Sequence, residues 1–158
     1  MKYFIGIDPG VSGAIAILNS EGQLAVFNAP TVEMKVGKAL KRRISPEILV
    51  SMLQPFTIEA SAWVEQVAAR PGQGVSSMFA FGESYGLVKG VLAGLQIQTN
   101  TVTPNAWKKA MQLNAGKDAS RAKAAQMWPQ QAGEFSRVKD DGKAEAALIA
   151  EYGRRHTF

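Results

Sequence analysis

Carboxylates occupy four positions where an ionised side chain is costly or where two acids share one face of a helix. Asp8 and Glu65 each end a run of apolar residues that predicts a β-strand. A charge at the edge of a hydrophobic core is strongly disfavoured unless it is paired or bound to a metal ion. Asp141 and Glu145 are four residues apart in an alanine-rich segment, so a helix there carries both carboxylates on one face.

These four side chains offer only oxygen ligands, and the chain has no cysteine and one histidine, His156. Oxygen-only donor sets favour hard cations such as Mg²⁺ or Mn²⁺. Two such ions about 3.5–4 Å apart can hold the attacking and leaving oxygens of phosphodiester hydrolysis. Alternatively, Asp8 starts a turn with Pro9 and Asp141 only caps a helix. The joint occurrence of all four acids favours the metal site, with two ions.

Residues 7–13 raise a different interpretation, because they form a glycine-containing turn between two predicted strands. Such turns can hold a phosphate through backbone N–H groups. Sugar kinases and actin-like ATPases begin with a similar acidic turn, but they need two domains of this kind. A chain of 158 residues is too short for both, which disfavours this alternative.

The composition indicates a basic globular domain. Lysine and arginine number 18 against 13 acidic residues, which gives a net charge of +5 and favours a polyanionic partner such as nucleic acid. Absence of cysteine excludes disulfides, thiolate zinc sites and cysteine nucleophiles, and one histidine argues against a Ser-His-Asp triad. We expect one domain over residues 1–158, with no membrane span and no export signal, in the cytoplasm (the host cytoplasm if phage-encoded).

The elements that must position the acids follow from hydrophobic pattern and turn residues. Strands are predicted at 3–8, 14–18, 23–27, 62–65 and 96–102. Helices are predicted to begin at Ser45 and to cover 76–95, 104–111, 117–128 and 141–154. The basic segment 31–43 is expected to be a long loop or an edge element. This order predicts an α/β fold: a five-stranded mixed sheet, three antiparallel strands followed by two parallel ones, flanked by helices.

Several motifs resemble those of the RuvC-type Holliday junction resolvases, members of the ribonuclease H-like superfamily. Ile5-Gly6-Ile7-Asp8-Pro9-Gly10 is similar to the opening of that family, and Glu65-Gln66-Val67 to its second acidic site. The branch found in phages, bacteria and chloroplasts is closer. Its pattern resembles residues 70–74, 77–79, 82, 85–86, 90–92, 104, 107–109 and 141–146, so the likeness spans residues 5–152.

The resemblance implies a ribonuclease H-like fold and a crossover junction endodeoxyribonuclease that nicks four-way DNA symmetrically as a homodimer and leaves 5′-phosphates. It implies catalytic, metal-binding roles for Asp8, Glu65, Asp141 and Glu145. Two features depart from bacterial RuvC. The late helix there carries Asp-x-x-Asp, which makes Asp140 the alternative to Asp141. The aromatic residue three positions after the second acid is Ala68 here, so the candidates for a wedge between DNA bases are Phe79 and Phe81.

Basic side chains predict how the protein contacts branched DNA, mainly through phosphates and with little sequence preference. Either Lys117 or Lys143 is a candidate to stabilise charge in the transition state. The predicted DNA-binding residues are Arg70, Lys108, Lys109, Lys117, Arg121, Lys139, Lys143, Lys38, Arg42 and Arg43. Two other functions remain open: a broader branched-DNA or RNase H-type nuclease, and a catalytically silent junction-binding protein.

Glycines recur every fourth residue in the helix predicted over 76–95, at Gly82, Gly86, Gly90 and Gly94. Each costs about 1 kcal/mol relative to alanine inside a helix, so a close contact along this stripe is expected. The helix could lie on its own sheet, or Gly82, Gly86 and Gly90 could form a homodimer interface. The resemblance favours the dimer.

Overall fold

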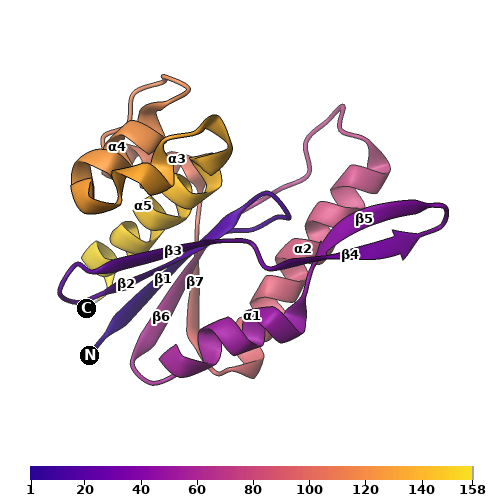
Figure 1. Ribbon diagram of the computed structural model, residues 1–158, viewed down its shortest axis with the longest axis horizontal. Coiled ribbons are helices and arrows are strands. Elements are labelled where there is room, and N and C mark those ends of the chain that lie inside the picture. Colours follow the sequence, from indigo (N-terminus) through magenta and orange to yellow (C-terminus); the bar gives the residue numbers. More distant parts are fainter. Residues whose placement is uncertain (158) are drawn as a thin grey trace.

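Strand β1 lies at the centre of a five-stranded sheet in the computed structural model, which describes residues 1–157 (Figure 1). The strand order is β3-β2-β1-β6-β7: β1 pairs antiparallel with β2 and parallel with β6. The bounds are β1 (Tyr3–Asp8), β2 (Ala14–Asn19), β3 (Leu24–Asn28), β6 (Ala60–Glu65) and β7 (Gln98–Val102). The predicted α/β class with a mixed sheet is confirmed.

Helices cover both faces of this sheet. Helices α1 and α2 pack on one face and α5 on the other, with α4 against α5. The bounds are α1 (Pro46–Leu53), α2 (Val75–Gly94), α3 (Pro104–Ala110), α4 (Ala119–Met127) and α5 (Asp141–His156), with 3₁₀ turns η1 (Gln54–Phe56), η2 (Pro129–Phe135) and η3 (Val138–Asp140). Ser45 caps α1 as predicted, since its Oγ accepts a hydrogen bond from the Ile48 N–H at 3.2 Å.

Alternation along β1 separates the two faces of the sheet. Ile5 and Ile7 belong to the core beneath α1 and α2, whereas Phe4 belongs to the core beneath α5. Side chains in a strand point to opposite faces in turn, so Gly6 and Asp8 share the α5 face with Phe4. The last residue of β1 therefore places its carboxylate on the same side as α5.

Helix α5 approaches β1 closely because small residues line the contact. A Cβ at Gly6 would collide with the backbone of Ala146 and Ala150. The alanines of α5 are fully buried, so the helix axis lies nearer to the sheet than bulky side chains would allow. This contact fixes how α5 is rotated about its axis, and so which of its acids faces the sheet.

The segment 31–43 forms a β-hairpin, where a long loop or edge element was expected. β4 (Thr31–Val36) and β5 (Ala39–Ile44) pair antiparallel in a separate two-stranded sheet that projects beside α2 (Figure 1). The high lysine and arginine content obscured the strand signal, and Gly37 turns the hairpin at φ 61°. Arg43 Nε contacts Glu83 Oε2 of α2 at 3.1 Å, which anchors the hairpin.

Smaller differences concern the ends of elements. β7 begins at Gln98, two residues later than predicted, because Gln96 adopts a left-handed conformation at φ 56°. Residues 129–135 form a 3₁₀ segment that the sequence had not predicted. Within residues 1–157, no helix combines the length and apolar character that a bilayer span requires.

Candidate metal site

Asp8 and Glu65 lie side by side at the ends of two neighbouring parallel strands. The register of β1 and β6 aligns Ile7 with Val64, so the next residues in each strand, Asp8 and Glu65, are also adjacent. Trp63, two residues before Glu65, packs against Gly153 of α5, which puts Glu65 on the α5 face as well. The parallel pairing therefore brings the two strand-end acids together.

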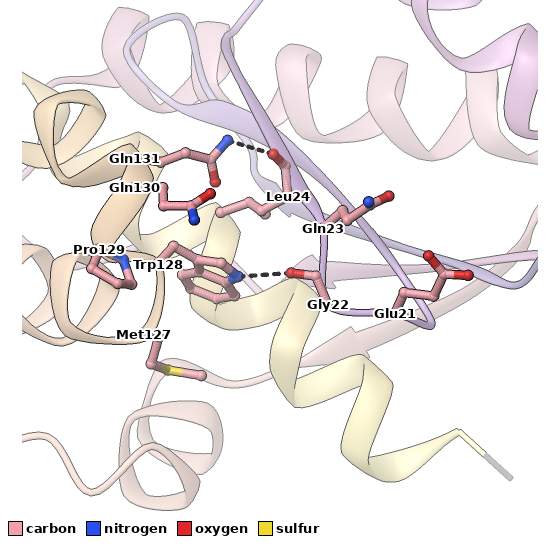
Figure 2. A pocket seen from close by; sticks show the side chains of 9 residues that line it. All are labelled: Glu21, Gly22, Gln23, Leu24, Met127, Trp128, Pro129, Gln130 and Gln131. Atoms are coloured by element: carbon pink, nitrogen blue, oxygen red, sulfur yellow. Dashed lines mark hydrogen bonds between the residues drawn. The ribbon is translucent and has the colours of Figure 1, made fainter.

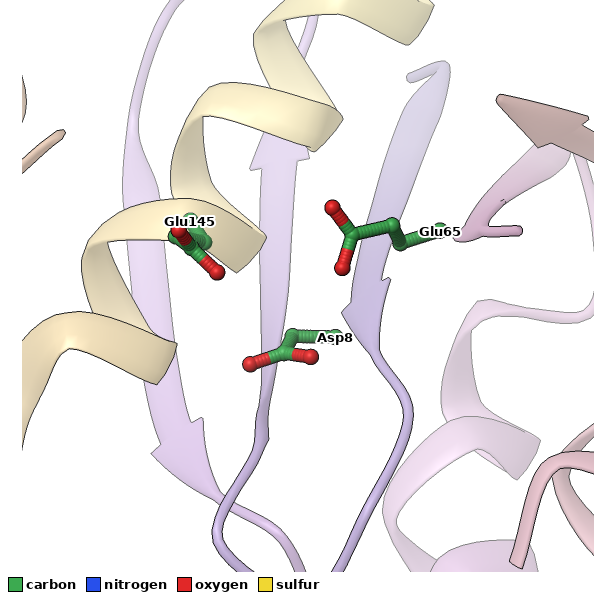
Figure 3. A group of neighbouring side chains, drawn as sticks. All are labelled: Asp8, Glu65 and Glu145. Atoms are coloured by element: carbon green, nitrogen blue, oxygen red, sulfur yellow. The ribbon is translucent and has the colours of Figure 1, made fainter. Parts of the chain in front are cut away.

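Glu145 completes a group of three carboxylates (Figure 3). It extends from the second turn of α5 toward the ends of β1 and β6. One ligand oxygen from each of Asp8, Glu65 and Glu145 lies within 4.8 Å of the others. Three carboxylates at this separation match the donor set of a hard divalent cation.

The crowding of negative charge perturbs the acids. Burial, together with the nearby carboxylates of Glu145 and Glu65, raises the pKa of Asp8 to about 8, against a lowering by Lys108. Burial also raises the pKa of Glu145, and Lys108 opposes this shift. Lys108 Nζ lies 3.5 Å from Glu145 Oε1. A bound cation would supply the positive charge that these carboxylates lack.

Trp107 fixes the orientation of Glu65. Its indole Nε1–H donates a hydrogen bond to Glu65 Oε1 at 2.9 Å, and both side chains are buried. Trp107 stands in α3, which follows β7 directly and is capped by the Thr103 hydroxyl. One oxygen of Glu65 is thereby held by the protein and the other is left for a ligand. The motif at residues 107–109 contains Trp107 but does not indicate this contact; the available signal is that a buried indole needs a hydrogen-bond acceptor.

Asp141 lies outside the three-acid group. Its Oδ1 accepts a hydrogen bond from Arg121 Nε at 2.8 Å, and its side chain is 47% exposed. Arg121 also pairs with Asp118 and donates to the Ser136 carbonyl. Asp141 is close enough to Glu145 to raise the pKa of that carboxyl. The spacing of four residues thus places both acids on one side of α5, but only Glu145 points at the strand ends.

Asp140, the alternative to Asp141, is committed to a structural pair. Arg137 contacts both of its oxygens, at 2.9 and 3.0 Å, and the Arg137 backbone N–H adds a third bond. The hydrogen bonds from Arg137 lower the pKa of Asp140 to about 2. The buried Asp140 therefore anchors the turn before α5 and is not part of the three-acid group.

The predicted DNA-binding residues fall into three sets: Lys108 beside the acid group, residues that are paired with an acid, and an exposed set. The paired residues are Arg121, Arg43 and the buried Lys143, whose Nζ lies 2.6 Å from Glu134. The ammonium of Lys143 is thus paired within the protein, whereas the other candidate charge stabiliser, Lys117, is exposed. The exposed set comprises Arg70, Lys109, Lys117, Lys139, Lys38 and Arg42.

Arg70 borders a cavity of about 470 Å³ next to Glu65. Phe81 lines the same cavity, and its ring lies against the position that a Cβ of Gly10 would take. Phe79 is 76% exposed. Of the two aromatic candidates for a wedge, Phe81 is therefore nearer to the acids, and Phe79 is the more solvent-exposed.

The glycine stripe of α2 faces away from the rest of the described chain. A Cβ at Gly82, Gly86, Gly90 or Gly94 would meet no atom of residues 1–157 within 4 Å. The interpretation that these glycines let α2 lie on its own sheet is wrong, because that contact runs through Val88 and Leu92.

A separate cavity of about 480 Å³ lies at the β2–β3 turn (Figure 2). Trp128 Nε1 donates to the Gly22 carbonyl at 3.3 Å and Gln131 Nε2 to the Leu24 carbonyl at 2.5 Å. Glu21 is the single ionisable residue among those that line this cavity. These bonds attach η2 to the edge strand β3 and do not form a reactive centre.

No protein-family model matches the chain, and no curated protein matches it. Among solved structures, Thermus thermophilus RuvC in complex with a Holliday junction substrate is similar at a TM-score of 0.63 and 15% identity, covering 99% of this chain and 98% of that one. A second T. thermophilus RuvC structure gives 0.55 and 20% identity, covering 97% and 96%. The chain thus has a ribonuclease H-like fold. More narrowly, the fold is of the RuvC type, as the motifs predicted.

Proposed function

We propose that this protein is a metal-dependent endonuclease that cleaves four-way DNA junctions. The observation that carries the proposal is the convergence of Asp8, Glu65 and Glu145 within 4.8 Å, at the strand ends of a RuvC-type fold. The junction-bound T. thermophilus structure supports branched DNA as the substrate. The net charge of +5 agrees with a polyanionic substrate.

The carboxylate group would hold Mg²⁺ or Mn²⁺, two ions per site. When bound, such ions activate water and neutralise charge on a phosphodiester, which yields 5′-phosphate and 3′-hydroxyl ends. Asp8, Glu65 and Glu145 would together hold the ions, since their carboxylate oxygens lie within 4.8 Å of one another. Asp141 is the proposed fourth ligand, and binding would exchange its ion pair with Arg121 for a metal contact. Lys108, whose Nζ lies 3.5 Å from Glu145 Oε1, would face a phosphate that approaches the acids.

Asp8→Asn tests the proposal directly. We expect loss of cleavage while junction binding, measured without divalent metal, is retained, because the substitution removes one ligand charge and preserves side-chain size. Glu21→Gln, an exposed acid at the β2–β3 turn, is the matched control and should cleave normally. Full cleavage by Asp8→Asn would refute the metal site.

Substrate comparison separates the proposed activity from its alternatives. Wild-type protein is incubated with four-way junctions, flaps, duplex DNA and RNA–DNA hybrid, and the nicks are mapped. Preferential, symmetric nicks in the junction support a resolvase. Equal cleavage of flaps or hybrid indicates a broader branched-DNA or RNase H-type nuclease. Binding with no cleavage in Mg²⁺ or Mn²⁺ indicates a silent junction-binding protein.

Symmetric nicking requires two active sites, and we propose a homodimer that joins through the glycine stripe of α2. The stripe is exposed along Gly82, Gly86 and Gly90, where another helix backbone could approach closely. Gly86→Leu should sediment as a monomer if the wild type sediments as a dimer. Ala122→Leu, at an exposed position of α4, is the control; an unchanged mass for folded Gly86→Leu would contradict this interface.

Residues 1–158 would act as one nuclease domain. We place it in the cytoplasm, the compartment that contains its proposed DNA substrate. Fractionation of cells that express the tagged chain tests this location. Recovery with the DNA-containing cytoplasmic fraction agrees with the proposal, and recovery outside it does not.

A further inference from the structure

A basic cavity of about 450 Å³ lies beside the acid group but is separate from it. It is enclosed by the β1–β2 turn, the base of the β4–β5 hairpin and the η3 turn that precedes α5. Its lining includes Ser12, Gly13, Arg42, Arg137, Lys139 and Asp140. Two of these segments contribute cationic side chains to one concave surface: Arg42 comes from the hairpin, and Arg137 and Lys139 come from the turn before α5.

The negative charge in this cavity is already neutralised. Asp140 is bound by Arg137 through both oxygens, so its charge is paired within the protein. A guanidinium has five N–H donors, and this pair uses the Nε and one Nη2 donor of Arg137. Arg137 is 57% exposed, so its remaining donors are accessible to a ligand.

Arg42 and Lys139 supply the uncompensated charge. Arg42 Nη2 donates to Ser12 Oγ at 3.3 Å, which holds the guanidinium over the β1–β2 turn. Within residues 1–157, neither Arg42 nor Lys139 has a carboxylate within 4.0 Å. The cavity therefore has a net charge of about +2 by formal charges, which suits a phosphate group.

The cavity shares a wall with the acid group. A Cβ at Gly13 would collide with the carbonyl oxygen of Asp8, so the turn that lines the cavity packs directly on the backbone of a metal-site residue. Gly142 of α5 packs against Ser12 and Gly13 from the other side. A phosphate in the cavity would consequently lie near the acids without reaching them.

We propose that Arg42, Arg137 and Lys139 bind one backbone phosphate of the substrate DNA, distinct from the phosphate that is cleaved. This inference rests on the proposed nuclease function. A second fixed phosphate would set the position of the strand, because two anchored phosphates restrain a backbone more than one. The hairpin would then close on DNA through Arg42 at its base.

The test measures junction binding in EDTA at a series of salt concentrations. For each phosphate neutralised, the slope of log K against log salt is about 0.9 in magnitude. Arg42→Gln/Lys139→Gln should reduce the slope magnitude by about 0.9, because it removes the two uncompensated charges on this phosphate and leaves only Arg137, which is paired with Asp140. The control, Lys2→Gln/Arg155→Gln, removes two charges near the chain ends (Figure 1) and should leave the slope unchanged.

The outcomes are distinct. A reduction of about 1.8 in slope magnitude would mean two separate phosphate contacts and would overturn the shared cavity. An unchanged slope, in a double variant with wild-type circular dichroism, would overturn the proposal while leaving the nuclease function intact. If the unmodified protein binds no DNA at all, the proposed function itself fails. Inorganic phosphate at millimolar concentration is added as a competitor of DNA binding. If it competes while the salt slope of the double variant stays unchanged, the cavity binds a free anion, and the proposal is also overturned.

Discussion

Replacing Trp107 by phenylalanine would test whether the indole positions Glu65 for metal binding. The substitution removes the Nε1–H donor that lies 2.9 Å from Glu65 Oε1 and retains an aromatic ring in a fully buried site. Glu65 would lose the contact that fixes its rotamer. Removing partners that orient a metal ligand typically lowers metal affinity about 10–100-fold, which corresponds to about 1.4–2.7 kcal/mol.

Trp107→Phe should also lower the free energy of unfolding, for a reason separate from metal binding. Without the indole N–H, a buried carboxylate oxygen has no donor, which costs about 1–3 kcal/mol, and the smaller ring adds a cavity term of the same sign. We therefore expect the free energy of unfolding of the metal-free protein, measured in urea, to fall. A cavity alone would lower this free energy but would leave the affinity of the folded protein for Mn²⁺ unchanged.

Two measurements separate these effects. Free Mn²⁺ is quantified by electron paramagnetic resonance during titration of the folded protein, and unfolding is followed by circular dichroism in EDTA. Trp63→Phe is the matched control, because that indole donates to the hydroxyl of Thr157 at 3.4 Å and not to a carboxylate of the acid group. Folded Trp107→Phe with wild-type Mn²⁺ affinity would refute the positioning role.

Two further predictions concern pH. Because the pKa of Asp8 is raised to about 8, this carboxyl is mostly protonated at pH 7 without metal, so Mn²⁺ binding should release close to one proton and tighten up to tenfold per pH unit until about pH 8. Calorimetry in buffers of different ionisation enthalpy measures this release, and its absence would contradict the raised pKa. The pKa of Asp140 is lowered instead, so its pair with Arg137 stabilises the fold above the ordinary pKa near 4 and ceases to do so as pH falls through about 2. Asp140→Asn should cost about 1–2 kcal/mol in urea unfolding at pH 7, with a smaller difference near pH 2; equal stability at pH 7 would show that the pair is not stabilising.

The sequence alone determined the features that depend on neighbours along the chain. The apolar runs that end at Asp8 and Glu65 predicted two strands whose last residues are acidic, and both strands are present. Ser45 and Pro46 predicted the start of α1. The five-stranded mixed sheet and the RuvC-type fold also followed from element order and motifs. The hairpin at 31–44 was missed, because charged residues on a two-stranded sheet with no buried face leave little hydrophobic alternation to detect.

Only the tertiary structure decided which polar groups meet. Asp141 and Glu145 are equivalent by helical spacing, yet the contact of Gly6 with the α5 backbone rotates Glu145 toward the strand ends and leaves Asp141 with Arg121. Pairing of Lys143 with Glu134, and of Trp107 with Glu65, joins segments whose approach no local pattern specifies. Spacing along the chain determines which side of an element a residue occupies, but packing between elements determines which atoms that side chain reaches.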